Sequence, residues 1–103
     1  MAVGFTPQHQ EELPYNELTS HQFLAIAIQT ARQLEWKLSH TSPNGFIAYT
    51  KMSWKSFSYK ITLKLEENTA TIKSESTGTE MVDWGRNKKQ VDQFTTAFSE
   101  TKN

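Results

Sequence analysis

The sequence predicts a single α+β domain in which an antiparallel sheet of about five strands carries two helices on one face. With 103 residues, the chain has room for one domain. Two segments repeat hydrophobic residues every three or four positions, as amphipathic helices do, and several others repeat them every second position, as half-buried strands do. The hydrophobic share is only 36%, but 3 Trp, 3 Tyr and 6 Phe supply large rings for one core.

The N-terminal residues 1–10 show no periodicity and are expected to form a flexible tail, followed by a domain over 11–103. Residues 11–18 are predicted to form a first strand. Proline donates no ladder hydrogen bond, so Pro14 indicates either that this strand lies at a sheet edge or that Pro14 stands at the start of a strand.

A helix is predicted to begin after Thr19, an N-cap residue with Gln22 three positions later in a capping box. Leu18 and Phe23 occupy the two positions of a hydrophobic staple. The expected buried face repeats at helical spacing through Leu24, Ala27, Ile28, Ala31 and Leu34. The expected wet face holds Gln22, Gln29, Arg32 and Gln33.

Four strands are predicted to follow the helix, because the period changes to two at Trp36. The sequence Ser42–Pro43–Asn44–Gly45 is typical of a tight turn, and 46–50 closes that hairpin. Residues 57–65 form the clearest strand, and 69–76 returns after a turn with Ala70 and Ile72 inward. The opposite face of the sheet is expected to carry Lys60, Lys64 and Lys73, with Thr62 and Ser74 between them.

A second helix is predicted after Gly78 and Gly85, which suggest tight backbone geometry. Asn87 is its expected N-cap, and its apolar stripe is Val91, Phe94 and Phe98. The resulting order, strand, helix, four strands, helix, is also that of a TATA-binding-protein-like repeat, an analogy of fold alone. A net charge of zero argues against nucleic acid as a partner.

The sequence offers no catalytic or metal-binding pattern. There is no Cys, and His9, His21 and His40 lack ligand spacing with one another or with a carboxylate on a shared helix. Neither a nucleophile elbow nor a glycine-rich phosphate loop is present. We therefore expect no enzyme activity, no cofactor and no metal.

Two segments are candidates for an interaction surface. Residues 51–55 join two predicted strands and supply Lys51, Met52, Trp54 and Lys55. Such a connection either packs its Trp or Met on the core rim or contacts a protein partner or an anionic membrane. Residues 86–89 supply Arg86, Lys88 and Lys89 at a helix start, where cations oppose the helix dipole and call for a nearby acid or an anionic partner.

A cytoplasmic location is the expectation from the hydropathy pattern. The longest apolar run, 23–28, is far shorter than the about 20 residues that a membrane span needs. The N-terminus lacks the basic and apolar regions of a secretory signal.

The segments 36–39, 45–50, 74–78 and 83–89 resemble a soluble domain that precedes the membrane core in some bacterial rhomboid-family intramembrane serine proteases. The family's catalytic Ser and His lie on membrane helices, and its G-x-S-G motif is missing here, so no catalytic residue carries over. The resemblance implies an accessory cytosolic domain at the inner face of the membrane. It also implies that the chain continues after Asn103 into the membrane part of a longer protein. The domain would regulate that membrane part, localise it or present substrates to it.

The alternative is a free-standing domain that binds a small apolar ligand between the sheet and the helices. Its expected cavity is lined by Trp36, Tyr49, Tyr59 and Trp84.

Overall fold

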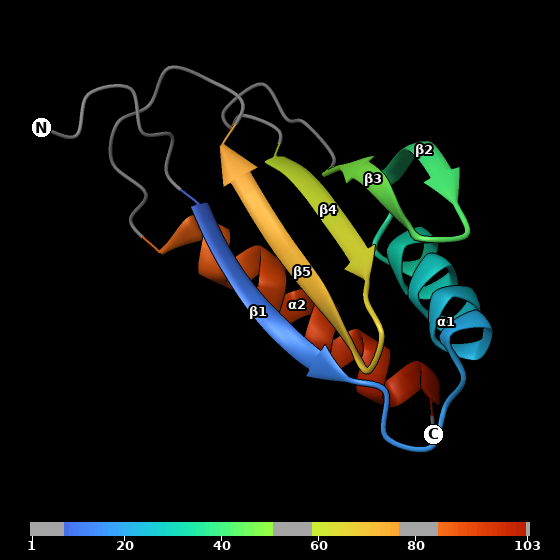
Figure 1. Ribbon diagram of the computed structural model, residues 1–103. Helices are drawn as coiled ribbons and strands as arrows, with labels where there is room; N and C mark the ends of the chain where they lie inside the picture. Colours follow the sequence, from blue (N-terminus) through green and yellow to red (C-terminus); the bar gives the residue numbers. More distant parts are fainter. Residues whose placement is uncertain (1–7, 51–58, 77–84, 103) are drawn as a thin grey trace, which may run out of the picture.

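The computed structural model describes residues 8–50, 59–76 and 85–102, and it has the predicted α+β architecture. The elements are β1 (Gln8–Pro14), α1 (Ser20–Gln33), β2 (Lys37–Ser42), β3 (Gly45–Tyr49), β4 (Tyr59–Leu65), β5 (Thr69–Ser76) and α2 (Arg86–Lys102). The strands form one antiparallel sheet in the spatial order β1-β5-β4-β3-β2, so β1 and β2 are its edges (Figure 1). The predicted order of strands and helices is confirmed.

The first strand lies earlier in the chain than the sequence predicted. Residues 8–10 pair with Glu75, Ser74 and Lys73 of β5, so they belong to the sheet and not to a tail. β1 ends at Pro14, four residues before the expected end. Its inward positions include the polar His9, so the strand has no hydrophobic period to reveal it and depends on pairing with β5.

The start of α1 follows the prediction. Gln22 N donates to Thr19 Oγ1 at 3.1 Å, and Thr19 N donates to Gln22 Oε1 at 2.9 Å, which completes the capping box. The expected wet face is exposed. The buried face is rotated from the expected one, because Phe23 and Thr30 are fully buried with Ala27 and Ala31, whereas Leu24 is only half-buried.

Backbone hydrogen bonds end α1 and turn the chain toward β2. Trp36 N donates to the Ala31 carbonyl and Glu35 N donates to the Arg32 carbonyl, both at 3.0 Å, which is the pattern of a Schellman motif. Glu35 takes the left-handed conformation of this motif, with φ at 62°. The Schellman motif thus explains why the hydrophobic period changes between Leu34 and Trp36.

Both helices cover the same face of the sheet. α2 packs against β1 and β5, α1 packs against β2 and β3, and the two helices contact each other (Figure 1). Aromatic rings connect these layers. The ring centroid of Phe94 on α2 lies 5.9 Å from that of Trp36 and 5.8 Å from that of Phe98. The ring centroid of Phe98 lies 4.6 Å from that of Phe23 on α1. Large aromatic side chains therefore fill much of the core, although hydrophobic residues make up only 36% of the sequence.

The β2–β3 hairpin turns at the predicted place, and Ser42 pairs with Gly45 across it. Gly45 has φ at 144°, and a Cβ placed there would overlap the carbonyl oxygen of Leu63 on β4. Glycine is therefore required here both by the backbone conformation and by the close approach of the neighbouring strand.

The predicted N-cap of the second helix is wrong. Gly85, with φ at 75°, precedes α2, and its carbonyl accepts the amide of Lys89 at 3.0 Å. Asn87 lies inside the helix and is fully buried, one turn before Val91 on the same stripe. The predicted stripe of Val91, Phe94 and Phe98 is confirmed.

Candidate functional site

The face of the sheet opposite the helices forms a polar surface, hereafter the open sheet face. Tyr59, Ile61 and Leu63 of β4 are buried beneath the helices, and the residues that alternate with them point to the other side. The strand registers extend this alternation across the sheet. The open sheet face consists of Gln8, Gln10, Glu12, Lys37, His40, Ile47, Tyr49, Lys60, Thr62, Lys64, Thr71, Lys73 and Glu75.

Lysines dominate the charge of the open sheet face. Lys73 pairs with Glu75 at 2.7 Å, whereas Lys60 and Lys64 have no ion-pair partner among the described residues. The surface between β1, β5 and β4 is hollowed by about 240 Å³. This hollow is lined by Gln10, Thr62, Lys64, Glu66, Thr71 and Lys73.

The prediction that Ser74 lies on the face opposite the helices is wrong. Ser74 is fully buried on the helix side, where its hydroxyl lies 2.6 Å from Asn87 Oδ1. The signal was available, because Ser74 follows the inward Ile72 by two residues in the same strand.

The predicted basic cluster at the start of α2 is exposed at Arg86, Lys88 and Lys89. An acid compensates Lys88, whose Nζ lies 2.8 Å from Asp92 Oδ2, one turn along the helix. The hydrogen bond to Asp92, together with its negative charge, raises the pKa of Lys88. The other predicted cluster, Lys51, Met52, Trp54 and Lys55, lies outside the described residues.

Of the residues proposed to line a ligand cavity, the three that the structure describes do not meet around one hollow. Trp36 and Tyr59 are 6% and 4% exposed and belong to the core cluster. Tyr49 follows the buried Ala48 and pairs with Lys60, so it lies on the open sheet face. The fourth residue, Trp84, lies outside the described residues.

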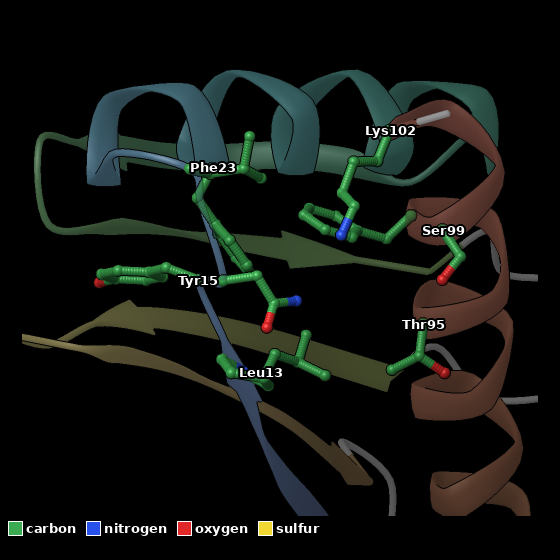
Figure 2. A pocket seen from close by; sticks show the side chains of 10 residues that line it. Leu13, Tyr15, Phe23, Thr95, Ser99 and Lys102 are labelled. Atoms are coloured by element: carbon green, nitrogen blue, oxygen red, sulfur yellow. The ribbon is translucent and has the colours of Figure 1, made fainter.

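A different hollow, hereafter the α2 pocket, opens at the end of β1 beside the last turns of α2 (Figure 2). Its volume is about 170 Å³. The side chains of Leu13, Tyr15 and Phe23 approach it from β1, the following loop and α1, and Lys102 reaches over it from α2. The remaining lining residues are Pro14, Asn16, Leu18, Thr95, Phe98 and Ser99.

The histidines do not converge on a reactive centre within the described ranges. His9 Nε2 lies 2.8 Å from Glu11 Oε2, and His21 and His40 are exposed on separate elements. In the part of the chain that the structure describes, no three metal-ligating side chains of His, Cys, Asp or Glu come together.

No helix among the described residues is long and apolar enough to cross a bilayer. Comparison with protein-family models and with curated proteins finds no match for this chain.

Proposed function

We propose that this chain is a non-catalytic interaction domain whose open sheet face docks on an anionic membrane surface. The observation that carries the proposal is the one-sided fold: both helices pack on one face, and the other face presents Lys37, Lys60, Lys64 and Lys73. The acids that the structure describes there are Glu12 and Glu75 of the face itself and Glu66 at the rim of its hollow, so four lysines stand against three acids and positive charge prevails although the whole chain is neutral.

Electrostatic attraction favours this orientation of the domain. A lysine near an anionic bilayer contributes about 1 kcal/mol, and flexible stems let several lysines reach headgroups from one face of the sheet. Lys37 and Lys64 are the most available, because both are exposed and neither has an ion-pair partner among the described residues. The exposed Lys89 lies on α2 and is a second, weaker candidate contact.

The resemblance to the soluble domain of rhomboid-type proteases supplies the context for such docking. In this proposal the chain is the cytosolic N-terminal domain of a membrane serine protease, and the catalytic residues belong to a membrane part outside this chain. The domain localises that part or presents substrates to it at the inner face of the membrane. Residues 51–55 are proposed as an additional contact on the basis of their sequence alone.

The second candidate function, a small-ligand-binding domain, is favoured by one observation, the aromatic α2 pocket. The α2 pocket is lined by none of the residues that form the open sheet face, so the two functions are tested separately.

Co-sedimentation with vesicles tests the docking proposal. We expect binding to vesicles that contain phosphatidylglycerol and none to vesicles of phosphatidylcholine alone. Lys64→Gln should weaken binding about fivefold, the equivalent of about 1 kcal/mol. Arg32→Gln is the matched control, because it removes the same charge from the exposed face of α1.

Two results would overturn the docking proposal. One is a failure of the unaltered chain to sediment with anionic vesicles at low salt, where surface attraction is strongest. The other is an equal loss for Lys64→Gln and Arg32→Gln, which would show attraction by net charge with no preferred face.

A further inference from the structure

We propose that the α2 pocket binds a small monocarboxylate with an apolar body about the size of one ring. This inference goes beyond the proposed docking function and concerns the other side of the molecule. It follows from an aromatic floor, a matching volume and a single cation at the mouth of the pocket.

The floor of the α2 pocket suits an apolar group. The ring centroid of Phe23 lies 5.2 Å from that of Tyr15 and 4.6 Å from that of Phe98, so three rings pack together beneath the pocket. Phe23 is fully buried, and the narrow exposed parts of Tyr15 and Phe98 are the ring surface that a ligand meets first. Leu13 and Leu18 extend it at the sides. The volume of about 170 Å³ is close to that of a cavity of about 150 Å³ known to hold benzene.

The polar groups at the mouth favour a carboxylate over a neutral or cationic head. Lys102 Nζ is turned toward the pocket, and the hydroxyl of Ser99 lies on the same side of α2 (Figure 2). The hydroxyl of Thr95 donates to the carbonyl of Asp92 at 3.1 Å, so Thr95 offers the pocket its methyl group. The ammonium group of Lys102 and the hydroxyl of Ser99 are donors for carboxylate oxygens. Lys102 has no ion-pair partner among the described residues, so its charge is available to a ligand.

The hydroxyl of Tyr15 is not available as a further donor. It bonds to the backbone carbonyl of Glu66 and is turned away from the pocket (Figure 2). Tyr15 therefore presents only its ring to a ligand, and the carboxylate must be recognised from the α2 side. This geometry fits a ligand with one acidic end and one apolar end.

A paired titration tests the assignment on the full chain. Phenylacetate and its neutral analogue phenylacetamide are each added while the backbone amides are followed by two-dimensional NMR. We expect saturable shifts around Thr95, Ser99 and Phe23 for phenylacetate, and affinity a few-fold weaker for phenylacetamide. Lys102→Gln should remove this difference, whereas Lys89→Gln, the same change on the same helix, should preserve it.

A second variant blocks the pocket without removing a core ring. Ser99 is exposed, and leucine is the better helix former, so Ser99→Leu should keep the fold while its side chain fills the mouth. We expect phenylacetate shifts to disappear in Ser99→Leu and to persist in Glu100→Leu, an exposed neighbour that does not line the pocket.

The inference fails if phenylacetate causes no saturable shifts at about 10 mM, a concentration that would reveal affinities in the millimolar range. It also fails if phenylacetamide binds as tightly as phenylacetate, or if Lys102→Gln retains the preference. None of these results affects the docking proposal, because vesicle binding is tested with Lys64 on the opposite face.

Discussion

Asn87 of α2 is joined to Ser74 of β5 by a hydrogen bond in the middle of a buried interface. Ser74 Oγ donates to Asn87 Oδ1 at 2.6 Å, and Asn87 Nδ2 donates to Ser76 Oγ at 3.0 Å. Ser74 and Asn87 have no exposed surface. One amide thus satisfies two hydroxyls of β5, and this pairing ties the first turn of α2 to a definite position on the sheet.

Asn87→Ala should lower the free energy of unfolding by about 2–3 kcal/mol. The substitution leaves the hydroxyls of Ser74 and Ser76 buried without their partner, and it opens a small cavity. Urea unfolding measures the loss. The triple variant with Ser74→Ala and Ser76→Ala should cost less than the sum of its single changes, because it removes the orphaned hydroxyls. Strict additivity would contradict this account.

Thr30→Val should leave stability unchanged or raise it by up to about 1 kcal/mol. Thr30 is fully buried, and its hydroxyl donates to the carbonyl of Ile26 at 2.7 Å, within its own helix. No buried partner is orphaned when this hydroxyl is replaced by a methyl group, since the carbonyl keeps its helical bond. Thermal unfolding decides the matter, and a large destabilisation would show that the hydroxyl has a further role.

Gly45→Ala should cost about 3 kcal/mol or more. The new Cβ would overlap the Leu63 carbonyl, and the backbone has a φ that side chains rarely adopt. Gly85→Ala is a useful comparison, because Gly85 also has positive φ but, among the described residues, no atom lies within 4 Å of the Cβ position. We expect the smaller loss there, about 1 kcal/mol, from backbone strain alone. Equal losses would assign the Gly45 effect to φ and not to the strand contact.

The features predicted correctly from the sequence are those that local patterns determine. The capping box at Thr19 and the alternation in 59–65 depend on neighbours within a few residues. The buried role of Asn87 was missed because an asparagine before an apolar stripe also fits an N-cap, and only its contact with β5 separates the two roles. The α2 pocket could not be predicted, because β1, α1 and α2 meet there from distant parts of the chain.

The ion pair between Lys88 and Asp92 should respond to alkaline pH. Asp92 raises the pKa of Lys88 above its ordinary 10.5, so the pair's stabilisation is complete below pH 10.5 and is lost as pH rises through the higher folded-state pKa. Asp92→Asn should bring the pKa of Lys88 back toward 10.5, as measured by NMR titration of its ε-methylene group.

Thermal unfolding adds a second measurement on the same pair. The difference in melting temperature between the unaltered chain and Lys88→Gln should be small, because the pair is exposed and screened, and should vanish above the raised pKa. In the Asp92→Asn background, Lys88→Gln should have no such pH-dependent effect. A pKa of Lys88 that does not move in Asp92→Asn would contradict the assignment of Asp92 as the acid that offsets cations at this helix start.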